Sequence, residues 1–319
     1  MLWYTRFMEA YPKDLEELEL NFSSEDSCRD YLASLRWPNG FLCPACGHGE
    51  LWRLADGLFK CKKCSRKTSV ISGTIFEGTR KPLASWFRAV WWVTSQKNGA
   101  SALGLMRVLG LGSYKTAWTW MHKLRRAMVR TGRDKLAGTV QVDETFIGGA
   151  KPGKRGRGAE GKTLVLIVAQ ENGKAVGRVR LVKILDASSK SLEAAIRETV
   201  VPGTQVKTDG WKGYNGLENL GYDHRVVRES EDVGANLLPL CHRVASLLKR
   251  WLGGTHQGAV SHEHLAYYLD EYTFRFNRRT SRSRGMLFYR LLQNAVAMEP
   301  IRFKEISLSV RGRNHKIQA

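Results

Sequence analysis

A chain of 319 residues is long enough for two or three domains that each bury a core of their own. Its 43% hydrophobic residues and 10 Trp exclude a largely disordered protein. Because 51 Lys and Arg outnumber 30 Asp and Glu, the formal charge of +21 favours a polyanionic partner, above all a nucleic acid. We find neither a spanning apolar run nor a signal peptide, so we expect a cytoplasmic, nucleoid-associated protein with no membrane partner.

The N-terminal segment carries the signals of one short helix. Ser24 is followed by acidic residues, and apolar residues recur on one face up to Leu35. A capping residue, acids in the first turn and a one-sided apolar stripe are typical of an amphipathic helix. We therefore predict a helix over residues 24–35.

Two close cysteine pairs come next. Cys43 with Cys46, and Cys61 with Cys64, form two CxxC turns separated by a short aromatic-rich stretch. In a reducing compartment such pairs indicate a metal rather than disulfides, and four thiolates suit one tetrahedral Zn²⁺. We predict a zinc ribbon whose ion is structural, because four thiolates leave no open coordination position.

Residues 82–130 have the apolar spacing of helices. Near their end a helix, a Gly-Leu-Gly turn and a second helix beginning at Ser113 follow one another, which is the order of a helix-turn-helix. In such a unit the second helix enters the major groove with its first residues toward the bases. Lys115, Arg125 and Arg126 of that helix are therefore candidate DNA contacts.

The pattern then changes from helices to strands. Three consecutive strands, a helix and a fourth strand fit a ribonuclease-H-like α/β domain better than a doubly wound one. A basic, glycine-rich loop between the first two strands offers Lys154, Arg155 and Arg157 as candidate phosphate contacts. The expected strands are 139–146, 163–170, 178–185, 204–208 and 223–227, and the expected helix is 188–200.

Two carboxylates in these strands suggest chemistry. Asp143 interrupts an otherwise apolar strand, which is a costly position for a carboxylate that neither pairs nor binds metal. Asp209 ends the fourth strand. In a ribonuclease-H-like sheet the first and fourth strands are neighbours, so the two acids would meet as in a two-metal phosphoryl-transfer site. Glu144 would point to the opposite face of its strand.

Several motifs together resemble one known family. CPAC and CKKC, KTAWTWMHKLRRAM, VDETFIGG, KTDGWKGY, HRVASLLKRWLGGTH and YLDEYTFRFNRR are similar, in order and spacing, to the zinc-ribbon, ISXO-like family of bacterial DDE insertion-sequence transposases. The resemblance runs from about residue 20 to about residue 295. It implies cleavage and strand transfer on double-stranded DNA at transposon ends and target, with Mg²⁺ or Mn²⁺ as cofactor and Asp143 and Asp209 as metal ligands. Pairing two ends calls for a homodimer or higher oligomer.

The third metal ligand departs from the family pattern. Related transposases place a glutamate seven residues before a basic residue on the last catalytic helix. Lys249 fits the basic position, and His242 stands where the glutamate would be. Positions seven apart share a helix face, so we expect His242 as third ligand and Lys249 and Arg250 as DNA contacts. Glu271 is the alternative third acid, although it could instead pair with Arg275 one turn later.

Two other functions stay open. A zinc-ribbon DNA-binding regulator, or a degenerate transposase that binds without cutting, is favoured by the histidine at the third position. A ribonuclease-H-like nuclease without strand transfer would share the acidic site. The domains that the patterns indicate are an N-terminal helical segment at 1–36, the zinc ribbon at 37–78, the helix-turn-helix domain at 79–132, the catalytic α/β domain at 133–300 and a basic tail at 301–319.

Overall fold

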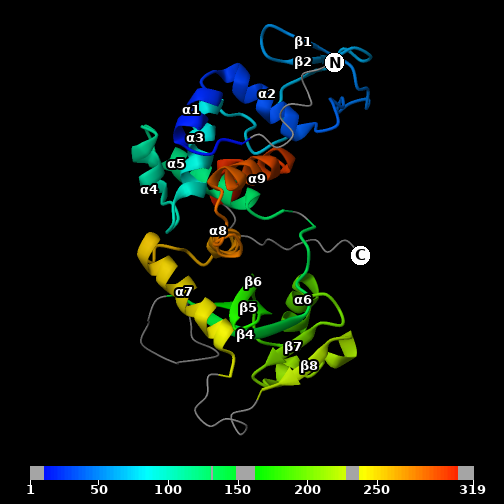
Figure 1. The fold of residues 1–319 in the computed structure, drawn as a ribbon, viewed down its shortest axis with the longest axis vertical. Coiled ribbons are helices and arrows are strands. Elements are labelled where there is room, and N and C mark those ends of the chain that lie inside the picture. The colour runs from blue at the N-terminus through cyan, green and yellow to red at the C-terminus, as the bar shows by residue number, and fades with distance from the viewer. Residues whose placement is uncertain (1–10, 131, 149–161, 228–236, 308–319) are drawn as a thin grey trace. The chain divides into compact units, whose positions relative to one another are not determined.

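The chain forms two compact units in the computed structural model (Figure 1). One unit holds residues 1–130 and 281–319, and the other holds residues 131–280. No helix in the described part of the chain combines the length and the apolar character needed to cross a membrane. The structure describes residues 11–130, 132–148, 162–227 and 237–307.

Helices dominate the first unit. Ser24 begins α2 as predicted, because its side chain accepts a hydrogen bond from the backbone N–H of Ser27 at 3.1 Å. A short helix before it, α1, lay outside the prediction. The helices of this unit are α1 (Leu15–Asn21), α2 (Glu25–Arg36), α3 (Leu83–Ser95), α4 (Ala102–Val108), α5 (Tyr114–Ala127), α9 (Arg284–Ala297) and α10 (Phe303–Ser307).

Helix α9 returns from the far end of the chain to pack on α2, α3 and α5. Phe288 at its centre is fully buried, with ring centroids 5.7 Å from Phe87 of α3 and 6.4 Å from Tyr31 of α2. Aromatic packing of this kind buries much apolar surface. The α/β unit consequently ends at Thr280, rather than at residue 300 as the sequence pattern indicates.

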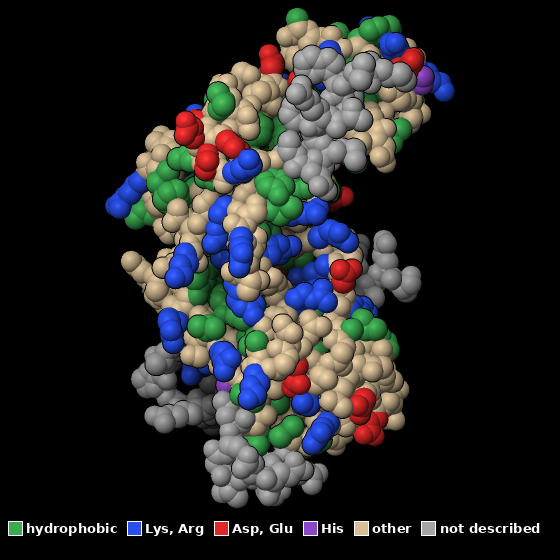
Figure 2. Space-filling view, viewed as in Figure 1, with side chains coloured by type: hydrophobic (Ala, Val, Ile, Leu, Met, Phe, Trp, Pro, Cys, Tyr) green, Lys and Arg blue, Asp and Glu red, His purple; other side chains and the backbone are tan. Residues whose placement is uncertain are grey.

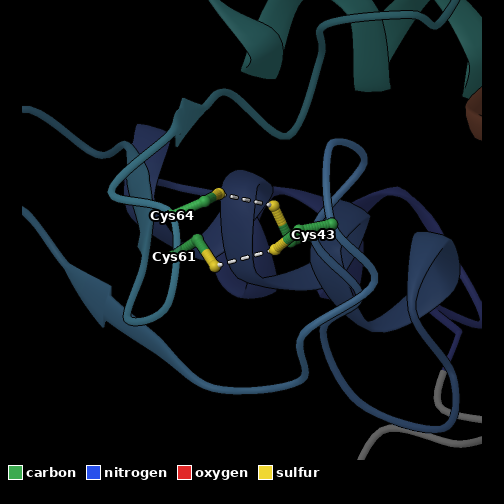
Figure 3. A group of neighbouring side chains, drawn as sticks. Cys43, Cys61 and Cys64 are labelled. Carbon is green, nitrogen blue, oxygen red and sulfur yellow. Dashed lines mark hydrogen bonds between the residues drawn. The ribbon is translucent and has the colours of Figure 1, made fainter.

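The cysteine pairs lie in a small antiparallel sheet of β1 (Leu51–Arg53), β2 (Phe59–Cys61) and β3 (Lys67–Thr68). All four sulfur atoms of Cys43, Cys46, Cys61 and Cys64 lie within 4.8 Å of one another. Figure 3 shows the side chains of Cys61 and Cys64 pointing toward that of Cys43. This four-cysteine cluster is consistent with a structural zinc ion.

Helices α4 and α5 pack against each other after a short connection. Helix α5 begins at Tyr114 with Ser113 at its N-cap position, as predicted. The apolar face of α5, including the buried Ala117, Met121 and Leu124, is turned into the protein.

A five-stranded mixed sheet forms the centre of the second unit, with strand order β6-β5-β4-β7-β8. β4, β5 and β6 pair antiparallel, whereas β7 is parallel to both β4 and β8. The first and fourth predicted strands are therefore neighbours, as expected. The strands are β4 (Thr139–Ile147), β5 (Thr163–Asn172), β6 (Ala175–Ile184), β7 (Gln205–Thr208) and β8 (Asp223–Val226).

Helices cover both faces of this sheet (Figure 1). On one face α7 and α8 pack on β5 residues such as Val165 and Ile167. On the other face α6 packs on the alternate residues Leu166 and Val168. The helical elements here are α6 (Ser189–Thr199), α7 (Pro239–Thr255), α8 (Leu265–Asn277) and the short 3-10 turns η1 (Lys212–Tyr214) and η2 (Glu218–Leu220).

The cysteine cluster leads to a first prediction. We expect the purified chain to carry one zinc ion and Cys61→Ser to lose it with a marked fall in melting temperature, because metal binding contributes directly to folding in a ribbon with so small a core. Metal analysis and thermal melts would measure both effects. Cys28→Ala, which alters a buried cysteine outside the cluster, should keep the zinc. A Cys61→Ser protein with bound zinc and an unchanged melt would contradict the assignment.

Candidate functional site

Parallel pairing of β4 and β7 brings the two predicted acids to the same level of the sheet. Gln141 of β4 pairs with Lys207 of β7. Asp143 lies two residues after Gln141, and Asp209 lies two residues after Lys207. Continuing the same register therefore places the two acids opposite each other. The Asp143 carboxylate accepts a hydrogen bond from the backbone N–H of Glu144 at 2.8 Å, which restricts its orientation.

Asp209 lies directly after β7 at a tight turn. Its carboxylate accepts a hydrogen bond from the backbone N–H of Trp211 at 3.0 Å. Gly210 between them has a φ of +80°, and a Cβ there would lie 2.6 Å from the side chain of Val226 in β8. Only glycine fits this close approach in the left-handed conformation. The motif TDGW therefore fixes where the Asp209 carboxylate stands.

Helix α7 supplies the third predicted residue. His242 lies in its first turns, and the Nε2 atom of its ring is 3.3 Å from Oδ2 of Asp143. The Asp143 side chain is 20% exposed and the His242 side chain 53% exposed, so solvent and ligands can reach the pair. Side chains alternate between the two faces of β4, so Asp143 points to the same face as Ile147. Ile147 belongs to the core covered by α7 and α8, and Asp143 therefore faces α7.

A partly buried polar network ties the start of α7 to the sheet. The side-chain oxygen of Gln141 accepts a hydrogen bond from the backbone N–H of Leu240 at 2.9 Å. The first turn of a helix leaves such N–H groups without partners inside the helix. The Gln141 amide nitrogen donates to Glu171 at 3.1 Å, and Glu171 in turn forms an ion pair with Lys207 at 3.0 Å. No local pattern in the sequence predicts this network.

Tyr214 lies beneath the acids on the α6 face. Its hydroxyl is buried, with no hydrogen-bond partner among the described residues. Burial raises the pKa of this phenol well above its usual value, and the nearby carboxylates of Glu144, Asp143 and Asp209 raise it further. The charges of three acids thus act on one neutral tyrosine. The sequence signal for it was the aromatic residue in KGY directly after Asp209, which we had not assigned.

Glu271, the alternative third acid, has a different environment. It is fully buried in α8, and one carboxylate oxygen is 2.9 Å from Nε of Arg275. An enclosed carboxylate with a cation one turn later is a structural ion pair of the kind that the spacing also allowed. This environment favours His242 over Glu271 for a role at an accessible site.

The predicted DNA contacts differ in accessibility. Lys115 is exposed near the start of α5, where its ammonium lies 4.0 Å from the ring of Phe303 in α10. Arg126 is partly exposed, but Arg125 is 1% exposed and is not offered to a partner in this structure. Lys249 and Arg250 are both exposed on α7, and the predicted contacts Lys154, Arg155 and Arg157 lie outside the described residues.

Comparisons with known proteins agree with this architecture. The ISXO2-like transposase domain matches residues 135–277, and the transposase zinc-ribbon domain matches residues 23–67. An uncharacterized protein in transposable element ISH50 of Halobacterium salinarum is 28% identical over 277 residues, which cover 80% of this chain and 91% of that protein. The sheet with its acids and the four-cysteine ribbon thus fall inside the two matched segments. The chain thus carries an ISXO2-like transposase domain together with a transposase zinc-ribbon domain.

Proposed function

We propose that this chain binds transposon ends and catalyses metal-dependent DNA cleavage and strand transfer through a ribonuclease-H-like domain. The observation that carries the proposal is the contact between His242 and Asp143, on a strand whose register with β7 is consistent with Asp209 lying level with Asp143. The register of β4 and β7 supports the first two positions, and the 3.3 Å contact with Asp143 supports the third.

The donor atoms of this site suit a hard divalent cation. Two carboxylates offer oxygen ligands, which Mg²⁺ and Mn²⁺ prefer, and the imidazole of His242 offers a nitrogen that Mn²⁺ accepts more readily than Mg²⁺. Bound there, such ions would lower the pKa of a nucleophilic water or hydroxyl and stabilise the leaving oxygen in phosphoryl transfer.

The chain's own residues would prepare the site before any ion binds. The backbone N–H groups of Glu144 and Trp211 orient the two carboxylates. The Gln141 amide holds the start of α7, and with it His242, against β4. Held in this way, the ligands need little rearrangement on binding, which favours both metal affinity and correct placement of the reacting phosphate.

Recognition of the ends would fall to the first unit. The proposal is supported by two consecutive helices, α4 and α5, joined by a short connection, and by Lys115, which is exposed near the start of α5. We propose that α5 enters the major groove of the transposon end. Joining two ends to one target requires two active sites, so we further propose that the chain acts as a homodimer or higher oligomer on double-stranded DNA.

The acids give the most direct test. Asp143→Asn and Asp209→Asn should each reduce joining of a labelled transposon end to a target plasmid to background, because metal capture needs the carboxylate charge. End binding, measured by gel shift, should persist. Lys115→Gln should have the opposite profile, with weakened end binding. Cleavage without joining in the wild-type chain would indicate a nuclease, and binding without either would indicate a regulator.

The third ligand can be tested separately. His242→Ala should remove most strand transfer, whereas His242→Glu should retain some with Mg²⁺ because a carboxylate restores an oxygen ligand. In the wild-type chain Mn²⁺ should support higher activity than Mg²⁺. Glu271→Ala should instead lower stability by about 3–5 kcal/mol, because it leaves Arg275 without its buried partner. Normal activity of His242→Ala, with loss of activity in a folded Glu271→Gln protein, would assign the position to Glu271.

The network at the start of α7 predicts a positioning effect. Gln141→Leu should cost about 1–3 kcal/mol of stability and lower the strand-transfer rate, because Leu240 N–H and Glu171 lose a buried partner. Hydrogen exchange at the Leu240 amide should accelerate. Gln205→Leu is the matched control, since the side-chain amide of Gln205 in β7 donates its hydrogen bond to Asp223 on the neighbouring strand and not to α7. Unchanged exchange at Leu240 would refute the proposed anchoring.

A further inference from the structure

Five arginines gather along one edge of the sheet in the second unit. Arg178 and Arg180 belong to β6, which is an edge strand. Arg278 and Arg279 follow α8, which packs on β6, and Arg133 precedes β4. None of these residues was among the DNA contacts predicted from the sequence. We call this group the β6 arginine cluster.

Backbone carbonyls hold one end of the cluster in place. The guanidinium of Arg279 donates hydrogen bonds to the carbonyl of Val176 and, at 3.3 Å, to that of Gly177, directly before Arg178. The same group lies 4.2 Å from the centre of the Phe276 ring. These contacts keep a charged side chain at the start of β6 although it is exposed to solvent.

The other end is fixed by Arg180. Its side chain is 5% exposed and donates to the carbonyls of Asp134 at 2.6 Å and Val179 at 3.1 Å. Asp134 follows Arg133 in the chain, so this bond brings Arg133 to the edge formed by β6. Arg178 is exposed between the two ends, with one long hydrogen bond of 3.4 Å to Gln170.

The cluster concentrates positive charge. Burial, together with the charges of Arg133, Arg178 and Arg278, lowers the pKa of Arg180 to about 10, and only the charge of Asp134 acts in the other direction. In the described part of the chain, Arg133, Arg178, Arg180 and Arg279 form no ion pair. Like charges held this close cost free energy unless an anion outside the chain compensates them.

We propose that the accessible members of the β6 arginine cluster bind the phosphate backbone of duplex DNA without regard to sequence, while the buried Arg180 holds the segment that carries Arg133. Guanidinium groups suit this role because they stay charged and match the geometry of phosphate oxygens. Lys and Arg side chains are numerous on the face shown in Figure 2, but the cluster is distinguished by the carbonyl bonds that hold Arg180 and Arg279. The inference rests on the proposed function, since it assigns to the catalytic unit a contact with its own DNA substrate.

A second explanation is protection of an exposed edge. Charged residues on edge strands discourage pairing with strands of another molecule. That role needs charge but no carbonyl bonds that fix the side chains, and it predicts self-association rather than weaker DNA binding when the charge is removed. The two explanations can therefore be separated by experiment.

The test uses the full chain with the Asp143→Asn change and no divalent metal, so that its result does not depend on catalysis. The probe is a labelled duplex that lacks transposon-end sequence, titrated at several salt concentrations. Arg133→Gln/Arg178→Gln removes two exposed or half-exposed charges and leaves the carbonyl bonds of Arg180 and Arg279 intact. The control is Lys190→Gln/Arg225→Gln, which also removes two positive charges. Lys190 lies in α6, and Arg225 lies in β8 at the opposite edge of the sheet.

We expect the cluster variant to bind roughly tenfold more weakly and the slope of log K against log salt to fall by about 2, since each lost phosphate contact contributes about 0.9. The control variant should keep the wild-type slope, and phenylglyoxal modification of Arg178 should be slowed by the duplex. Equal losses in both variants, or an unchanged slope, would overturn the proposal. The proposal would also be overturned if the cluster variant self-associated but bound DNA normally. It would likewise be overturned if the variant lost affinity for duplex RNA and kept its affinity for duplex DNA. If the wild-type chain shows no strand transfer, the proposed function is refuted, but the result of this binding test still stands.

Discussion

The parallel hydrogen bonding of β4 with β7 is the contact on which the arrangement of the second unit depends. Antiparallel neighbours can follow one another through short turns, and β4, β5 and β6 do so. A parallel neighbour requires a crossover, which α6 provides on one face of the sheet. The opposite face is then free for α7 and α8, and Asp143 faces α7. The position of His242 is thus a consequence of sheet topology.

Polar groups between the sheet and α7 add specificity to this packing. Burying an amide and an ion pair costs free energy unless every donor and acceptor is satisfied. Only the observed register lets the network of Gln141, Glu171 and Lys207 form its hydrogen bonds and ion pair. A shift of β4 by one residue would turn Gln141 to the other face of the sheet. The same requirement keeps Asp143 level with Asp209.

Local patterns in the sequence predicted most elements of the second unit and the start of α2 and α5. Alternation and capping residues are local signals, so a single sequence contains them. The partner of a helix is not a local property, which is why the return of α9 to the first unit was missed. The role of Gln141 was missed for the same reason, because its partner Leu240 lies 99 residues away.

Arg125 illustrates a different limit of prediction from residue type. It was chosen for charge, although Ala117, Met121 and Arg125 follow one another at intervals of four and therefore share a helix face. Both Ala117 and Met121 are fully buried, and Arg125 is buried with them. The helical period was thus the better guide to exposure than residue type. His242, by contrast, was chosen from spacing along a helix, and it lies beside Asp143.

The distribution of charge in the second unit suits a protein that must hold both cations and DNA. A cation site needs net negative charge, whereas a phosphate backbone needs positive charge, and the two would cancel if they coincided. β4 and β6 are separated by β5, so their axes lie about 10 Å apart at the usual spacing of strands. That separation is close to the screening length of about 8 Å at physiological salt. Asp143 and Asp209 can therefore keep their charge for a metal while the β6 arginine cluster lies within the span of one DNA duplex.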